Sequence, residues 1–190
     1  MNDSSKSFSL KNSFPDLTGQ TLNNRYRLHQ AIGTGASGTV YVAVDLNTSQ
    51  RVAVKVLNPS LSSDNKFLER FYREAKKVSS LNHPNILRVY DWGVDGSPYL
   101  VTEYLGGGSL RSILMTGYRL TPGQTLLVGL EACKALAHAH ERGIIHQDIK
   151  PANFLFGQDG VLRISDFGLT NALRETTQSE TPTEGFTGTV

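Results

Sequence analysis

The pattern of hydrophobic and polar positions divides the chain into a tail, a strand-rich part and a partly helical part. Residues 1 to about 24 are rich in Ser, Asn and Thr and have apolar residues at no fixed period, which predicts a mobile tail. From Tyr26 onward, runs rich in Val and Tyr are separated by Gly, Asn and Ser. These runs predict an antiparallel sheet with strands at residues 26–31, 39–45, 51–57, 86–92 and 99–104.

Two helices are predicted from caps and apolar spacing. Ser63 or Asp64 can cap a helix that runs to about Ser80. A second helix begins with Thr121 as cap and Pro122 in the first turn, and Gly143 stops it after about residue 142. Its apolar stripe consists of Leu126, Leu130, Cys133, Ala137 and His140. Between the two helices, three glycines at 106–108 break the chain as a hinge between lobes would.

Glu74 lies on the apolar side of the first helix, with Phe71 and Val78. A carboxylate there needs a partner, because an unpaired buried charge costs several kcal/mol by order of magnitude. One candidate is Lys55, which stands in an otherwise apolar strand and needs an anion of its own. The other is Arg70, on the same helix. Spacing alone leaves the two equal, and the surrounding motifs favour Lys55.

Composition removes several classes of function. At 38% hydrophobic residues in 190, the chain can bury a core, and its net charge of +2 comes with no run of Lys or Arg. Nucleic-acid binding therefore has no compositional support. A single cysteine, Cys133, excludes an intramolecular disulfide. No secretory apolar region or membrane-length segment is visible, which predicts a cytoplasmic chain without a membrane segment.

A glycine-rich loop spans residues 33–40, with glycines at Gly33, Gly35 and Gly38. Such a loop also opens dinucleotide-binding folds, but there a helix follows it. Here a β-branched run at 40–44 follows, which disfavours a dinucleotide-dependent oxidoreductase and predicts a flap whose backbone N–H groups approach phosphates. The apolar residues expected to roof a purine are Ile32, Val40 and Ala53.

A short hairpin provides the strongest geometric argument. Residues 154–156 and 161–164 are apolar runs joined by a Gly-Gln-Asp-Gly turn, and a hairpin brings its open ends together. Asn153 and Asp166 should therefore face one another and offer oxygen ligands to Mg²⁺ in an octahedral site. Asp148 lies on the loop that leads into the hairpin, within reach of that site.

These motifs occur in the order of the protein-kinase signature set: the glycine loop, Lys55 in Val-Ala-Val-Lys, Glu74, His-Gln-Asp-Ile-Lys-Pro-Ala-Asn at 146–153 and Asp-Phe-Gly at 166–168. From about Tyr26 to Val190, the chain resembles a eukaryotic-like (Hanks-type) bacterial Ser/Thr protein kinase. The resemblance implies an α+β, two-lobe fold. Residues 25–104 would form an N-lobe with an antiparallel sheet and one main helix, and residues 105–190 a partial, mainly helical C-lobe.

The resemblance also implies the activity and the roles of single residues. The activity is transfer of the γ-phosphoryl group of MgATP to Ser/Thr hydroxyls of proteins. Asp148 would be the catalytic base, Lys150 would neutralise charge on the transferred group, and Lys55 would hold the α- and β-phosphates while pairing with Glu74. Glu103 and Leu105 would present backbone groups to adenine. The other implied contacts are Leu155 as the floor of the pocket, Thr102 at its back, and a stack of Val78, Val89, His146 and Phe167 linking the lobes.

Two departures from the family pattern affect the reading. Gln147 stands where many kinases have the arginine that pairs with a phosphorylated activation loop. The resemblance also stops before the Ala-Pro-Glu element, so the stripe from Leu126 to Ala137 is expected to lack cover, and these residues alone to be poorly folded or weakly active. That ending favours a rival, a catalytically inactive nucleotide-binding or interaction module (a pseudokinase). The intact Lys55, Asp148 and Asp166 disfavour the rival.

Overall fold

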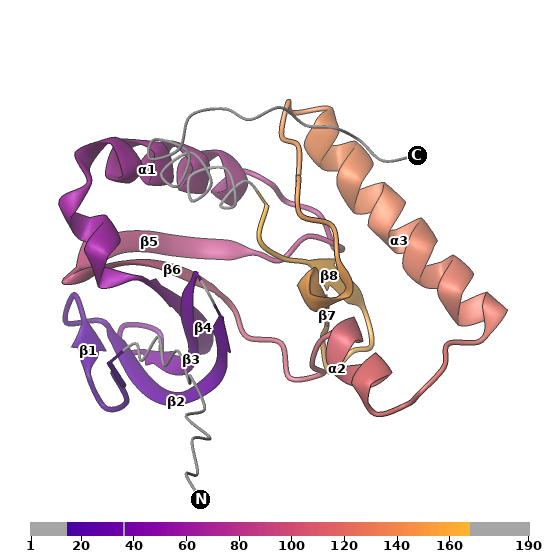
Figure 1. The fold of residues 1–190 in the computed structure, drawn as a ribbon, viewed down its shortest axis with the longest axis horizontal. Helices are drawn as coiled ribbons and strands as arrows, with labels where there is room; N and C mark the ends of the chain where they lie inside the picture. Colours follow the sequence, from indigo (N-terminus) through magenta and orange to yellow (C-terminus); the bar gives the residue numbers. More distant parts are fainter. Residues whose placement is uncertain (1–14, 36, 168–190) are drawn as a thin grey trace, which may run out of the picture.

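Within residues 15–35 and 37–167, which the computed structural model describes, six strands form one antiparallel sheet in the order β1-β2-β3-β4-β6-β5 (Figure 1). The strands are β1 (Thr21–Leu22), β2 (Tyr26–Gly35), β3 (Gly38–Asp45), β4 (Arg51–Leu57), β5 (Val89–Asp95) and β6 (Ser97–Glu103). A 3₁₀-helix, η1 (Pro59–Ser63), and the helix α1 (Asn65–Ser79) lie between β4 and β5. The sheet and α1 make up the N-lobe, as the sequence predicts.

The chain's entry into the sheet corrects one expectation. The predicted mobile tail extends to about residue 24, but Thr21–Leu22 pairs with β2 as strand β1, and Leu22 is buried. The backbone N–H of Leu17 also donates to the Tyr41 hydroxyl at 3.2 Å. Apolar side chains at Leu17 and Leu22 pack on the sheet core, which explains why this part is fixed. Residues 1–14 lie outside the described residues.

The helix α1 forms as its sequence predicts. Asp64 is the N-cap, and its Oδ1 accepts a hydrogen bond from the backbone N–H of Phe67 at 3.0 Å. The buried residues Phe67, Phe71, Ala75 and Val78 recur at helical spacing. Through this face α1 joins a core that also includes β8 and α3, so the core is shared between the two lobes.

The C-lobe within the described residues contains α2 (Leu110–Met115), α3 (Pro122–His140), the 3₁₀-helix η2 (Pro151–Asn153) and the hairpin of β7 (Phe154–Phe156) and β8 (Leu162–Ile164). Figure 1 shows the hairpin between the sheet and α3. Both backbone groups of Ile164 form hydrogen bonds with the segment before β5. The N–H of Ile164 donates to Asn85 O and its carbonyl accepts from Leu87 N, both at 2.9 Å. The hairpin is therefore held by both lobes.

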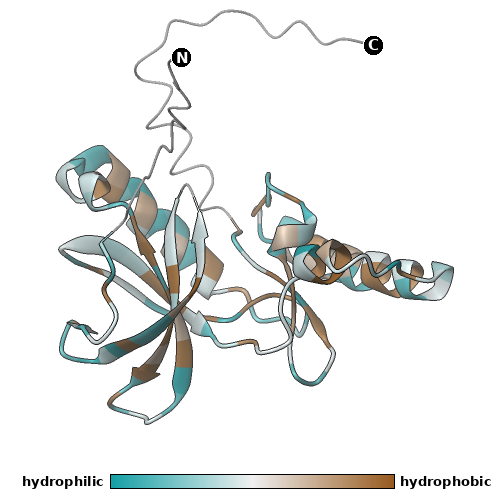
Figure 2. Cartoon of the chain, turned by 60° about the horizontal axis from the view of Figure 1, so that its bottom comes forward, coloured by the Kyte–Doolittle hydropathy of each residue, from teal (hydrophilic) through white to brown (hydrophobic). Residues whose placement is uncertain are grey.

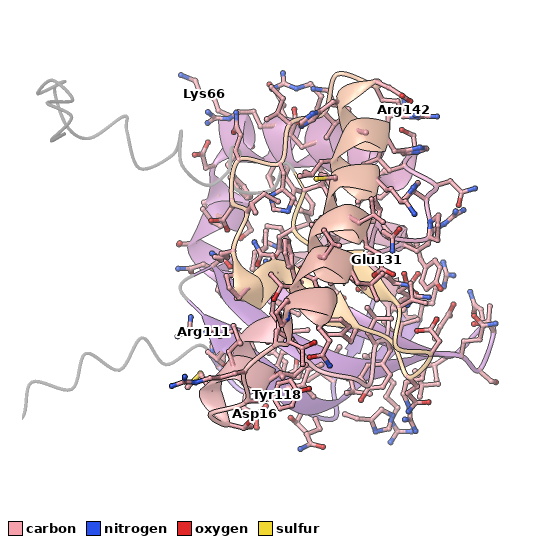
Figure 3. The ribbon with its side chains drawn as sticks, turned by 90° about the vertical axis from the view of Figure 1, so that its right-hand side faces the viewer. Asp16, Lys66, Arg111, Tyr118, Glu131 and Arg142 are labelled. Atoms are coloured by element: carbon pink, nitrogen blue, oxygen red, sulfur yellow. The ribbon has the colours of Figure 1, made fainter. Side chains whose placement is uncertain are left out.

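The helix α3 begins with the predicted cap, in which Thr121 Oγ1 accepts from Gln124 N and the Gln124 side chain accepts from Thr121 N. Its buried face is made of alanines: Ala132, Ala135 and Ala139. Small side chains allow α3 to approach β8 closely, and Glu131, in the middle of the helix in Figure 3, accepts from Leu162 N at 3.2 Å.

The predicted stripe lies on the opposite side of α3. Leu126 is 74% exposed and Leu130 51% exposed, and Cys133 is exposed as well. In Figure 2, hydrophobic positions are visible along much of α3. The expectation that this stripe lacks cover is thus confirmed for the described residues. No helix within those residues is long and apolar enough to cross a bilayer.

Candidate active site

A cavity of about 420 Å³ lies between the sheet and the β7–β8 hairpin. It contains the predicted roof, hinge and floor together. The residues predicted from sequence that line it are Ile32, Gly33, Val40, Ala53, Lys55, Glu103, Leu105, Leu155 and Asp166. Thr102 and the stack residues Val78, Val89 and Phe167 line it too. Residues far apart in the sequence therefore meet at one apolar cleft with a charged end.

The three glycines of the loop have different environments. Gly38 has a φ of +147°, and a Cβ there would overlap the carbonyl oxygen of Val56 on the neighbouring strand. Gly38 is thus required by the β3–β4 pairing itself. At Gly33 and Gly35, an added Cβ would meet nothing within 4 Å among the described residues. Of the three, only Gly33 lines the cavity.

Lys55 and Asp166 form the charged end of the cavity. The ammonium of Lys55 lies 2.6 Å from Asp166 Oδ1, and the two side chains are only 17% and 28% exposed. Asp166 has a φ of +63°, a left-handed conformation that aspartate tolerates better than most residues. This backbone turn directs the carboxylate back from the end of β8 toward the sheet.

The predicted ion pair between Lys55 and Glu74 is wrong in this structure. Glu74 Oε1 instead contacts Lys77 Nζ at 3.0 Å and Arg73 Nε at 3.3 Å. The alternative left open above was local pairing with Arg70, whereas the cations on α1 that the structure places at Glu74 are Lys77 and Arg73. The physical reason is competition: Asp166 occupies the ammonium of Lys55, and two cations on α1 already satisfy the Glu74 carboxylate.

Asp148 is held by the two groups that follow it in the loop. Lys150 Nζ lies 2.7 Å from Asp148 Oδ2, and Asn153 Nδ2 donates to the Asp148 carbonyl at 2.7 Å and to its Oδ2 at 3.2 Å. Partial burial acts to raise the pKa of Asp148, but the hydrogen bonds from Lys150 and Asn153 outweigh it and leave that pKa below its ordinary value. Asp148 is therefore a carboxylate at neutral pH.

Asn153 and Asp166 offer a donor set that fits Mg²⁺. The backbone N–H of Ser165, next to Asp166, donates to the Asn153 carbonyl at 2.9 Å, so the open ends of the hairpin meet as predicted. Asn153 uses its amide nitrogen on Asp148, and within the described residues its Oδ1 and Asp166 Oδ2 have no hydrogen-bond partner. Two hard oxygens suit this cation, which keeps several waters and phosphate oxygens in its shell. The described residues contain no cluster of three or more His, Cys, Asp or Glu ligands.

His146 braces the loop from beneath. Its Nδ1 accepts from Asp148 N at 3.2 Å, so its Nε2 carries the proton and donates to Ser165 O at 2.8 Å. Burial lowers the pKa of His146, in agreement with this neutral tautomer. The ring also packs edge-on against Phe167, with centroids 4.5 Å apart. A neutral, buried histidine thus ties the loop before the hairpin to the strand end after it.

Two serines of the cavity were missed by sequence reasoning. Ser109 caps α2, with its hydroxyl accepting from Ser112 N at 3.1 Å, and both serines line the cavity beside Gly108. The signal was present, because a serine followed three residues later by a second polar residue is a capping pattern. The glycines at 106–108 were interpreted only as a hinge, so the helix cap that follows them was not predicted.

Comparisons with known proteins agree with the fold. A family model described as "Protein kinase domain" matches residues 26–190. The chain therefore belongs to the protein kinase domain family. PknB of Mycolicibacterium smegmatis is 40% identical over 177 residues, covering 90% of this chain and 28% of PknB. PrkC of Bacillus subtilis is 39% identical over 166 residues, covering 87% of this chain and 26% of PrkC.

These relatives narrow the class: the chain is a bacterial Hanks-type Ser/Thr kinase domain similar to those of PknB and PrkC. Among solved structures, the PknI kinase domain of Mycobacterium tuberculosis superposes with a TM-score of 0.72 at 31% identity, covering 80% of this chain and 61% of that one. The chain spans about a quarter of the length of the curated relatives it matches, 28% for PknB and 26% for PrkC.

Proposed function

We propose that this domain binds MgATP in the cleft and transfers its γ-phosphoryl group to Ser or Thr hydroxyls of protein substrates. The contact between Lys55 and Asp166, at 2.6 Å, carries the proposal. It joins the cation of the sheet to the carboxylate of the hairpin at one end of a cavity whose other end is formed by Glu103 and Leu105. A nucleoside triphosphate has the same polarity, with an apolar base at one end and anionic oxygens at the other.

The adenine would lie between Ala53 above and Leu155 below, with its edge toward the backbone of residues 103–105. Lys55 would hold the α- and β-phosphates, and the loop glycines would allow backbone N–H groups to approach phosphate oxygens. Asn153 and Asp166 would hold Mg²⁺, which when bound neutralises phosphate charge. Gly33 and Gly35 fit this role, because nothing among the described residues occupies the space beside them.

Asp148 would orient the acceptor hydroxyl and take its proton. Its lowered pKa supports that role, because only the ionised carboxylate can take the proton of the hydroxyl. Lys150 is half exposed and bonded to Asp148 Oδ2, so its ammonium is close to where negative charge develops on the transferred group. A preorganised cation at such a point contributes a few kcal/mol to transition-state stabilisation.

The test is transfer of radiolabel from ATP to a generic Ser/Thr protein substrate, measured for this chain and for its Asp148→Ala variant. Asp148→Ala should abolish transfer and leave nucleotide binding intact. Asp16→Ala, which changes an exposed acid that does not line the cleft (Asp16 is labelled in Figure 3), is the matched control. Nucleotide binding by this chain without any transfer would replace this proposal with the rival, a nucleotide-binding module.

A further inference from the structure

Behind the hinge, Arg163 connects the two lobes through side chains. Arg163 is the middle residue of β8, and its Nε lies 3.3 Å from Oε2 of Glu103, the last residue of β6. The two side chains are 18% and 20% exposed, so the pair is largely removed from water. Ion pairs with this degree of burial are screened less by solvent than surface pairs.

Asp159, in the turn of the hairpin, fixes the orientation of the Arg163 fork. Its two carboxylate oxygens accept from Nη1 at 3.1 Å and Nη2 at 2.9 Å. Asp159 Oδ1 also accepts from Val161 N at 3.0 Å, which holds the carboxylate to its own turn. The bidentate contact pre-orients the guanidinium and leaves Nε for Glu103.

Glu103 is fixed from the N-lobe side as well. Its Oε1 accepts from the backbone N–H of Arg88, just before β5, at 2.9 Å. A continuous polar chain therefore runs from the hairpin turn through Arg163 and Glu103 to β5. The far end of the hinge is tied by backbone alone: Gly107 N donates to Phe156 O at 3.0 Å, and Phe156 N donates to Gly108 O at 2.9 Å.

The position of Arg163 links this series of polar contacts to the cleft. Arg163 pairs with Leu155, the floor of the cavity, and the strand that carries Arg163 ends just before Asp166. Glu103 begins the hinge segment that lines the other end of the cavity. The contact thus connects the two ends of the cleft without contributing a group that reaches its charged end.

We propose that Arg163 is a positioning residue that sets the distance between the hinge and the metal-binding hairpin by clamping Glu103. The inference rests on the proposed nucleotide site. A ligand that spans the whole cleft needs both ends at the right separation, whereas a ligand that uses one end does not. The clamp should therefore act on ATP and not on adenosine.

The experiment measures binding of MgATP and of adenosine by calorimetry to the parent chain and to Arg163→Met, which keeps most of the apolar stem. Losing an ion pair between two largely buried charged groups should weaken MgATP binding about tenfold. Adenosine affinity should change less than twofold, since adenosine needs only the hinge end. Arg142→Met is the matched control, because Arg142 is exposed at the end of α3 (Figure 3), where it donates to the His138 carbonyl at 3.0 Å and forms a 3.7 Å ion pair with Glu141.

A second variant, Glu103→Gln, protects the test against misfolding of the first. It should reproduce the loss of MgATP affinity, and the double variant should be no weaker than either single one, because both act on the same ion pair. Equal weakening of ATP and adenosine, additive single effects, or unchanged MgATP affinity would each overturn the clamp. A parent chain that binds no MgATP would instead overturn the proposed function, so the two failures are distinguishable.

Discussion

Replacing Asp45 with asparagine should destabilise the N-lobe by about 2 kcal/mol at neutral pH. Asp45 is 4% exposed, and its carboxylate accepts from Arg25 Nε and Nη2, both at 2.9 Å. It also accepts from Asn47 N at 3.1 Å and Thr48 Oγ1 at 3.0 Å. The Arg25 guanidinium is the main cause that lowers the pKa of Asp45 from 3.8 to about 2. One pKa unit corresponds to about 1.4 kcal/mol, which gives the figure above.

The sign of the pH dependence follows from the direction of this shift. A carboxylate whose folded pKa is depressed contributes stability above its unfolded pKa, and that contribution is lost as the pH falls toward the folded value. The difference between parent and Asp45→Asn should thus be constant above about pH 5, by the same linkage, and shrink between 3.8 and about 2.

Urea unfolding followed by fluorescence, at pH 7 and at intervals down to the acid limit of folding, measures this difference. Asp16→Asn is the matched control: Asp16 is exposed, and within the described residues its carboxylate accepts hydrogen bonds only from the nearby Thr18, so its replacement should change the free energy of unfolding little. A variant that is as stable as the parent at pH 7, or a difference that does not shrink on acidification, would show that the Arg25–Asp45 pair does not stabilise the sheet.

Two further predictions concern the glycine loop and the loop that carries Asp148 and Lys150. Gly38→Ala should lower the melting temperature, because its φ of +147° and the Val56 carbonyl leave no room for a Cβ, and such strain costs about 1–3 kcal/mol. Gly33→Ala should keep the melting temperature and weaken MgATP binding in calorimetry; equal melting of the two variants would contradict this. Lys150→Met removes a hydrogen bond that lowers the pKa of Asp148, so the acid limb of the kcat/KM profile should move to higher pH. An unmoved limb would mean that Lys150 does not control this ionisation.

The parts of the structure that could be predicted are those whose cause lies in neighbouring residues. Asp64 caps α1 through the N–H of a residue three positions away, and the spacing of Phe67 and Phe71 sets the buried face. The hairpin likewise follows from its own turn and two apolar runs, and it brings Asn153 beside the strand end at Ser165. In each case local geometry alone decides which atoms meet.

The partner of Glu74 could not be predicted in the same way. The contact depends on where α1 lies as a rigid body relative to the sheet. It also depends on whether the carboxylate of Glu74 or that of Asp166 lies closer to Lys55. In the structure Asp166 does, and Glu74 keeps Lys77 and Arg73. The sequence pattern is the same whether Lys55 pairs with Glu74 or with Asp166, because either pairing gives the lysine one carboxylate partner. Spacing therefore identifies Lys55 as an anion-binding residue without specifying the anion.

The sequence also does not specify which face of α3 packs against the core. Leu126 and Leu130 have helical spacing, but so do Ala132, Ala135 and Ala139, and leucines would be expected to contribute more free energy on burial. In the structure the alanine face is the buried one, and its small side chains allow α3 to come close enough to β8 for Glu131 to accept from Leu162 N. That bond supports β8, the strand that carries Arg163 and ends beside Asp166. Close packing of a small-residue face thus positions the β7–β8 hairpin, and it leaves Leu126, Leu127 and Leu130 uncovered by the described residues.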